Sequence, residues 1–142
     1  MIRFCIADSN PPRFKRRIIK KWITDCVIHE NFYVGNINFI FCSDEYLLQI
    51  NQKWLHHDYY TDVVTFDYTT DKIISSDIYI SLDRIDDNSI KYNVSYHEEL
   101  FRVLIHGILH LTGFNDSNKS ELAIMRRKEN DCLKLLAGES GL

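Results

Sequence analysis

The spacing of hydrophobic and polar positions divides the chain into short strands and amphipathic helices. Residues 2–7 are apolar and end at a turn-forming Asp-Ser-Asn-Pro-Pro segment, so they predict a strand. A helix is predicted over residues 13–29, because its apolar positions recur every three or four residues. By the same criteria we expect further strands at 37–42, 63–68 and 77–81, and further helices from Ser43 to about residue 54, at 82–91 and at 119–136.

One more helix is predicted to start at Ser95 and to be central. Ser95 with Glu98 three residues later fits a capping box, and Glu99 adds a second negative charge at the positive end of the helix. From Leu100 onwards the segment is apolar almost all round, which indicates burial. Gly113 is a natural stop, since glycine readily adopts the left-handed conformation that ends many helices.

These elements predict an α+β fold, with a mixed sheet of about four strands packed against about five helices. A length of 142 residues suits a single domain, expected at 1–136, followed by a loose tail at 137–142. Hydrophobic residues make up 45% of the chain and charged residues 26%, as in ordinary globular proteins. Neither a membrane-spanning run nor a signal peptide is recognisable, so we expect a soluble cytoplasmic protein.

The four cysteines are far apart and form no CxxC pair, so we expect reduced packing residues and no disulfide. The net charge of −3 argues against bulk attraction to nucleic acid, although residues 1–21 hold seven basic side chains and one acidic. Within that segment the candidate contacts to RNA phosphates recur at helical spacing: Arg13, Arg16, Arg17, Lys20 and Lys21. The alternative is an ordinary solvated face of an amphipathic helix, and the sequence weighs the two about equally.

The strongest chemical signal is the segment His-Gly-Ile-Leu-His-Leu-Thr-Gly-Phe-Asn-Asp at residues 106–116. His106 and His110 are four residues apart, so on a helix they share one face and can reach one metal ion at about 2.0–2.1 Å. Because Gly113 breaks the helix, the chain can turn back and bring the Asp116 carboxylate to the same point. Two histidines and a carboxylate with one open position are typical of a catalytic zinc site, with one zinc ion per chain.

Two buried core histidines are the alternative interpretation of His106 and His110. An unpaired polar group in such a core costs roughly 1–3 kcal/mol, whereas a whole zinc site contributes on the order of 10 kcal/mol. The metal therefore explains two polar rings on an apolar helix better than core packing does. In zincin metalloproteases a glutamate follows the first histidine and acts as general base, but here that residue is Gly107, which argues against peptide hydrolysis.

At these residues the chain resembles the YbeY-type endoribonucleases, bacterial ribosomal RNA maturation factors with a zincin-like metal site. Their signature is HGxLHLxG[YF]xH, and residues 61–66 and 77–81 are similar to the family's T[DN]V[LI][ST]F and GDIxIS strands. Asn51 lies where the family has an Leu-Asn pair. The family's usual third ligand is a histidine, and Asp116 stands at that position. The family commonly has an arginine six residues before the Thr-Asp-Val motif, where it could bind phosphate, and this chain has Leu55 there. An added negative ligand should make a bound ion less electrophilic.

The resemblance implies a zinc-dependent endoribonuclease that acts in ribosomal RNA maturation and small-subunit quality control, with ribosomal RNA and the small subunit as partners. Because Leu55 lacks the arginine's charge, a metal-stabilised RNA-binding or ribosome-assembly module with little catalysis is a second hypothesis. A zinc metalloprotease is a third, which Gly107 disfavours. Glu129 could brace the metal site, although we expect it to be a partly exposed glutamate at the edge of the last helix's apolar stripe.

Overall fold

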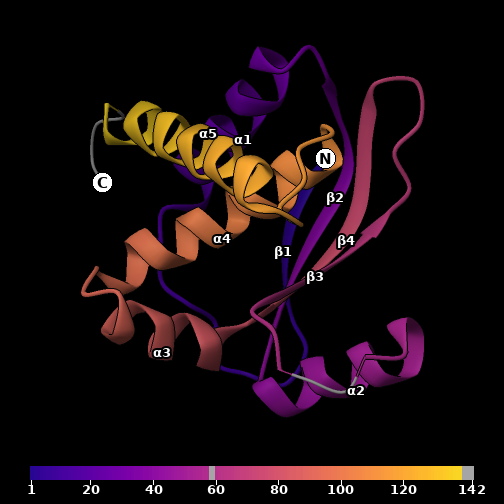
Figure 1. Cartoon of the computed structure of the whole chain (residues 1–142), viewed down its shortest axis with the longest axis vertical. Helices are drawn as coiled ribbons and strands as arrows, with labels where there is room; N and C mark the ends of the chain where they lie inside the picture. The colour runs from indigo at the N-terminus through magenta and orange to yellow at the C-terminus, as the bar shows by residue number, and fades with distance from the viewer. Residues whose placement is uncertain (58–59, 139–142) are drawn as a thin grey trace.

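The computed structural model describes residues 1–57 and 60–138. They form a four-stranded mixed sheet with strand order β1-β2-β4-β3 and five helices, which confirms the predicted α+β class (Figure 1). β1 (Ile2–Ile6), β2 (Tyr33–Cys42) and β4 (Ile73–Ser81) run parallel, and β3 (Val63–Asp67) pairs antiparallel with β4 at the edge. The helices are α1 (Arg16–His29), α2 (Asp44–Leu55), α3 (Leu82–Lys91), α4 (Tyr96–Leu111) and α5 (Lys119–Ala137).

Two strands are longer than the sequence predicts. β2 begins at Tyr33 rather than at residue 37, and β4 begins at Ile73 rather than at residue 77. The added residues pair with one another, and a register shift separates them from the regular part of the two strands. At Gly35 the strands come so close that a Cβ would lie 2.6 Å from the Ser75 hydroxyl, so glycine is required there. Periodicity alone did not indicate this irregular pairing.

α1 begins three residues later than predicted. Lys15 is its N-cap, with extended backbone angles, and residues 13 and 14 lie outside any helix or strand. The basic positions Arg16, Arg17, Lys20 and Lys21 remain helical, but Arg13 lies before the helix. At the other end of the chain, α5 includes Ala137 and is capped by Gly138; the rest of the predicted tail lies outside the described residues.

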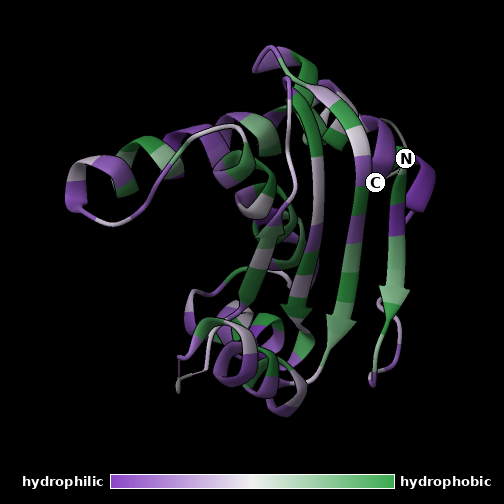
Figure 2. Ribbon diagram, turned by 90° about the vertical axis from the view of Figure 1, so that its right-hand side faces the viewer, coloured by the Kyte–Doolittle hydropathy of each residue, from purple (hydrophilic) through white to green (hydrophobic). Residues whose placement is uncertain are grey.

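The main hydrophobic core lies between one face of the sheet and helices α1, α4 and α5. Figure 2 looks onto the other face, where hydrophobic and polar residues alternate along the strands as half-buried sheets require. Near one end of that face α2 packs through Leu47 against Cys42 and Val64, which form a smaller second cluster. None of the helices in the described ranges is long and apolar enough to cross a membrane.

Candidate metal centre

α4 carries the two candidate histidines through the middle of the fold. Its start is fixed as predicted, because the Ser95 hydroxyl accepts a hydrogen bond from the Glu98 backbone N–H at 3.0 Å. The helix is buried along most of its length: its own residues Leu104, Ile105 and Ile108 are at most 1% exposed. His106 and His110 are only half-buried, so this helix holds both rings firmly while leaving one side of them accessible.

The turn after α4 brings Asp116 back to the histidines. α4 ends at Leu111, and Gly113 has a φ of +108°, the left-handed conformation predicted for it. Phe114 then donates its backbone N–H to the Leu109 carbonyl at 3.1 Å and packs against the main core. This anchored turn reverses the direction of the chain, so that Asp116 lies beside the face of α4 that carries His106 and His110.

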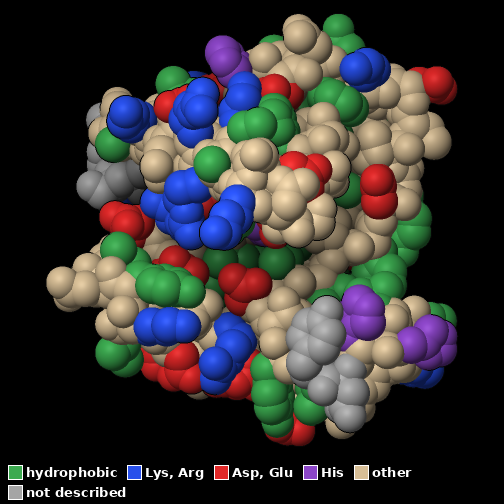
Figure 3. Space-filling view, in the orientation of Figure 1, with side chains coloured by type: hydrophobic (Ala, Val, Ile, Leu, Met, Phe, Trp, Pro, Cys, Tyr) green, Lys and Arg blue, Asp and Glu red, His purple; other side chains and the backbone are tan. Residues whose placement is uncertain are grey.

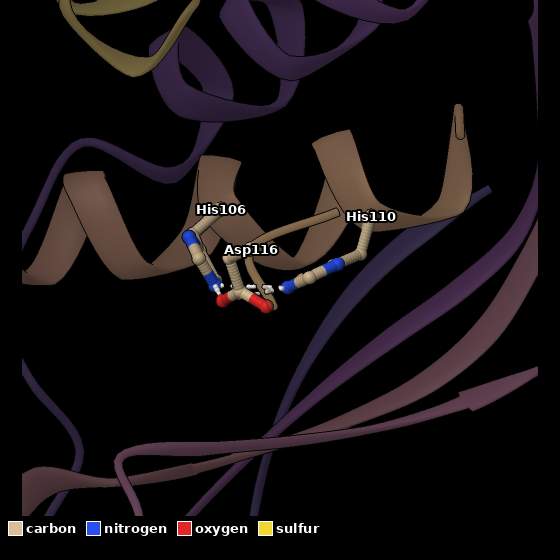
Figure 4. A group of neighbouring side chains, drawn as sticks. All are labelled: His106, His110 and Asp116. Carbon is tan, nitrogen blue, oxygen red and sulfur yellow. Dashed lines mark hydrogen bonds and ion pairs between the residues drawn. The ribbon is translucent and has the colours of Figure 1, made fainter. Parts of the chain in front are cut away.

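The three predicted ligands converge on one point, as Figure 4 shows. Asp116 Oδ2 lies 3.2 Å from His106 Nε2 and 3.3 Å from His110 Nε2, and the two nitrogens are 3.0 Å apart. Ligand atoms about 2.0–2.1 Å from a tetrahedral zinc ion are separated from one another by about 3.4 Å. The spacing of these three atoms therefore fits a single small ion held on three sides.

Glu129 of α5 contacts the opposite nitrogen of His106. Its Oε2 lies 2.6 Å from His106 Nδ1, and its Oε1 accepts a hydrogen bond from Arg102 Nη1 at 3.0 Å. Arg126 Nη1 lies 3.4 Å from the same Oε1. Glu129 is 4% exposed, so the expectation of a partly exposed residue was wrong. It is buried because it falls on the stripe of α5 that also carries Met125 and Cys132, and its partners satisfy both carboxylate oxygens.

The charges around His106 shift the pKa values of both partners. Burial disfavours the charged imidazolium, but the hydrogen bond and charge of Glu129 outweigh it, so the pKa of His106 is raised. Burial likewise opposes the charge on Glu129, and the contacts with His106 and Arg102 overcome it, so the pKa of Glu129 is lowered. Both shifts therefore favour the pair in which a protonated His106 imidazole donates to an ionised Glu129 carboxylate.

A small cavity of about 120 Å³ opens beside this network. Two further carboxyl groups line it, Asp62 and Glu99, together with Arg102, Arg126 and His106. Burial raises the pKa of Asp62, and it raises the pKa of Glu99 to about 7. Sequence analysis did not identify this group, since its residues come from α4, from α5 and from the loop before β3. The available signal was a charged residue at a buried position of α4 or α5.

The basic residues predicted to contact RNA are all exposed but are not gathered at the histidines. Arg16 and Lys20 lie over the ring of Phe4, with 5.8 Å and 5.9 Å to its centroid, and Lys21 pairs with Asp25 at 3.0 Å. Arg13 borders a separate groove of about 840 Å³ between the segment just before α1, the start of α4 and the end of α5.

The four cysteines are free, and three of them are buried, as expected for packing residues.

Comparison with known proteins identifies the family. The model of the family "Endoribonuclease YbeY" matches residues 7–137. The endoribonuclease YbeY of Azobacteroides pseudotrichonymphae is 48% identical over 133 residues, covering 94% of this chain and 96% of the relative. That of Parabacteroides distasonis is 43% identical over 138 residues, with 97% of each covered.

A solved structure has a similar fold. The solution structure of TM1509 from Thermotoga maritima superimposes with a TM-score of 0.67 at 28% sequence identity, covering 97% of this chain and 90% of that one. The family model and the curated relatives each match nearly the whole chain, and the chain therefore belongs to the YbeY endoribonuclease family.

Proposed function

We propose that this protein is a zinc-dependent endoribonuclease that acts in the maturation of ribosomal RNA and in quality control of the small ribosomal subunit. The observation that carries the proposal is the convergence of His106, His110 and Asp116 on one point, in a chain of an endoribonuclease family. The RNA of the small ribosomal subunit would be the substrate, the subunit itself would be the partner, and the protein would act in the cytoplasm.

The three side chains would hold the ion in complementary ways. His106 and His110 stand one turn apart on a buried helix, so their nitrogens are positioned with little conformational freedom. Asp116 follows a turn and is 39% exposed, so it can adjust to the ion and leave one side open. A bound zinc ion would supply Lewis-acid chemistry, either polarising a phosphate or lowering the pKa of a coordinated water to about 7.

An RNA strand would approach along the open side of this centre. The edge strand β3 lies next to α4, since Thr65 Oγ1 is 3.8 Å from the position of a Cβ at Gly107, and we assign it to the wall of the substrate cleft. Figure 3 shows Lys and Arg side chains gathered over α5, above a hollow with acidic side chains at its edge. Such cations favour phosphate binding near an otherwise acidic centre.

We further propose that the predicted α1 residues Arg13, Arg16, Arg17, Lys20 and Lys21 contact RNA at a second place. The groove beside Arg13 supports this assignment. Its basic lining residues include Lys15, Arg102 and Lys134, against one acidic residue, Glu98, and Phe101 is among its apolar ones. Basic grooves with aromatic side chains are suited to single-stranded nucleic acid.

One observation favours a second function, a metal-stabilised RNA-binding or ribosome-assembly module with little catalysis. At the position where the family pattern has an arginine, Leu55 ends α2 and is 37% exposed, so it cannot stabilise phosphate charge. Peptide hydrolysis is disfavoured by Gly107, which has no side chain to act as a base.

The deciding experiment measures zinc content and RNA cleavage on the same preparations. Wild-type protein should contain about one zinc per chain and cleave small-subunit RNA, and His106→Ala and Asp116→Ala should lose both properties. Asn115→Ala, next to the candidate ligand, is the matched control and should retain both. Zinc binding and RNA binding without cleavage would instead support the assembly module, and absence of zinc uptake by the wild type would refute the proposal.

A further inference from the structure

We propose that Glu129 is a positioning residue. It holds His106 as the tautomer that is protonated at Nδ1, so that Nε2 is unprotonated and points at the candidate metal site. This inference rests on the proposed metal function, because it concerns the competence of one candidate ligand. Its starting point is the 2.6 Å contact between Glu129 Oε2 and His106 Nδ1, which joins α5 to α4 across 23 residues of sequence.

The partners of Glu129 decide which atom carries the proton. Oε1 accepts from Arg102 at 3.0 Å and lies 3.4 Å from Arg126, so two guanidinium groups face that oxygen. A carboxylate held in this way acts as an acceptor, and it therefore needs a donor at His106 Nδ1. The Asp116 carboxylate faces the other nitrogen, Nε2, but at 3.2 Å against 2.6 Å, so the shorter contact with Glu129 favours the proton on Nδ1. A neutral imidazole protonated there has a lone pair on Nε2 for a metal ion.

The same contact fixes the direction of the ring. His106 Nε2 is within 3.3 Å of both other ligand atoms only in its present rotamer, and a ring flip would place a carbon there. Glu129 resists that flip because its side chain is 5% exposed and its other oxygen is held by Arg102, which is itself only 17% exposed. The contacts from Arg102 to Glu129 and from Glu129 to His106 therefore use the packing of α4 and α5 to hold the ligand atom Nε2 in place.

A purely structural role is the competing explanation. Glu129 occupies a position on the apolar stripe of α5, where it could serve only to join α5 to α4 through Arg102. An ion pair of that kind needs no contact with His106, however, and one oxygen would suffice for it. Instead Oε1 contacts the two arginines and Oε2 contacts the His106 imidazole. The Glu129 carboxylate therefore both joins the two helices and holds the candidate ligand.

The first test compares zinc affinity in Glu129→Gln with that of the wild type, by competition with a chelator. Glutamine keeps the size of the side chain but lacks the charge, and we expect zinc to bind about 10–100-fold more weakly. Asp131→Asn is the matched control, since it makes the same charge change at an exposed position of α5 and should leave affinity unchanged. Unchanged affinity in Glu129→Gln, with only a lower melting temperature of the metal-free protein, would make the role structural and overturn the inference.

The second test needs no metal and separates this inference from the proposed function. Nitrogen chemical shifts of His106 in the metal-free protein, recorded above the pH at which the ring is protonated, should report the Nδ1–H tautomer. In Glu129→Gln this preference should fall, while the ring of the exposed His29 should be unaffected. An Nε2–H tautomer in the wild type would overturn the inference, even if zinc binds; the predicted tautomer in a protein that does not bind zinc would refute only the metal function.

Arg102 gives a test of the chain of contacts. Arg102→Met should weaken zinc binding in the same direction as Glu129→Gln but by a smaller factor, because Arg126 still faces Glu129. If Arg102 acts through Glu129, the double variant should be no weaker than Glu129→Gln alone. Independent, multiplying effects would show that Arg102 does not act through Glu129.

Discussion

Gly107 of α4 lies directly against Ile78 of β4, where a Cβ at position 107 would come within 3.3 Å of the Ile78 Cγ2 methyl. This contact explains why the residue after the first histidine carries no base. A side chain there would point into the sheet, toward Ile78 and Thr65, and away from solvent. The glycine is therefore a packing requirement of the buried helix.

Enlarging Gly107 should consequently destabilise the fold without creating a protease. For Gly107→Ala, the gain in helix propensity of about 1 kcal/mol is offset by overpacking of about 1–3 kcal/mol, so the free energy of unfolding should fall by at most about 2 kcal/mol. Gly107→Glu should lower it by about 3 kcal/mol or more, because a carboxylate would be buried without a partner. Urea denaturation measures both changes.

Gly138→Ala is the control for that experiment, because a Cβ at Gly138 makes only an ordinary contact of 3.5 Å, with the Leu135 carbonyl oxygen. Its free energy of unfolding should change by less than about 0.5 kcal/mol. A wild-type stability in Gly107→Glu, or protease activity on casein, would contradict the assignment of Gly107 to packing.

Replacing Asp116 by histidine should preserve metal binding. The third candidate ligand follows a turn and its side chain is 39% exposed, so a longer imidazole can be accommodated where the family signature has a histidine. We expect Asp116→His to bind zinc within about tenfold of wild type, and Asp116→Ala to bind at least about tenfold more weakly. Calorimetric titration with zinc measures both, and equal affinity of Asp116→Ala and wild type would remove Asp116 from the ligand set.

Zinc should stabilise the protein, because the three ligand atoms are brought together only in the folded chain. A ligand at 100 times its Kd that binds only the folded state adds about 2.7 kcal/mol. Melting temperature should therefore rise when zinc is added to chelator-treated protein, and it should not rise in His110→Ala. Equal shifts in both proteins would indicate binding elsewhere on the chain.

The sequence predicted the mixed sheet, the helices and the convergence of His106, His110 and Asp116, and it did not predict the surroundings of these three side chains. His106, His110 and Gly113 follow local rules of helical spacing and helix termination, and the family signature matched them directly. Glu129 was misjudged because its burial depends on Arg102 and His106, which lie 27 and 23 residues away on another helix. A periodic pattern marks its position as buried but does not identify a partner.

The errors in element bounds have a similar origin. β2 extends back to Tyr33 because it pairs there with Ile73, an interaction between residues 40 positions apart that neither segment indicates alone. The start of α1 was misplaced by three residues, since Arg13 fits the basic face of a helix, whereas the backbone is still extended at the N-cap, Lys15. Local patterns gave the type of each element, and tertiary pairing set its length.

Glu99 should make the stability of the protein depend on pH. Its pKa rises from an ordinary 4.5 to about 7 in the folded state because it is buried, so folding favours its neutral form. The stability contributed by that form is fully present below pH 4.5, falls as pH rises toward 7 and is constant above it. Relative to Glu99→Gln, which cannot ionise, wild type should lose up to roughly 3 kcal/mol across this window.

Denaturation of the metal-free protein at a series of pH values tests this expectation. Other groups that titrate in the same range are common to both proteins, so the difference between them isolates Glu99. Glu98→Gln, a neighbouring exposed carboxylate, is the control and should track wild type at every pH. A constant difference between wild type and Glu99→Gln from pH 4.5 to 7 would show that folding does not raise the pKa of Glu99.

The basic residues just before α1 and in its first turns should contribute to RNA affinity through charge. Arg13 and Arg17 are both exposed, and neither is described in an ion pair, so Arg13→Gln/Arg17→Gln removes two cations with little effect on packing. Each phosphate contact in a single strand contributes about 0.7 to the slope of log K against log salt concentration. The double variant should lower that slope by about 1.4 and weaken binding at low salt.

Fluorescence anisotropy of a labelled RNA with chelator-treated protein, in which the proposed zinc-dependent cleavage cannot occur, measures both quantities. Lys53→Gln/Lys91→Gln, which removes the same charge from α2 and α3, is the control. If both double variants lower the slope equally, the effect reflects net charge and α1 is an ordinary solvated face.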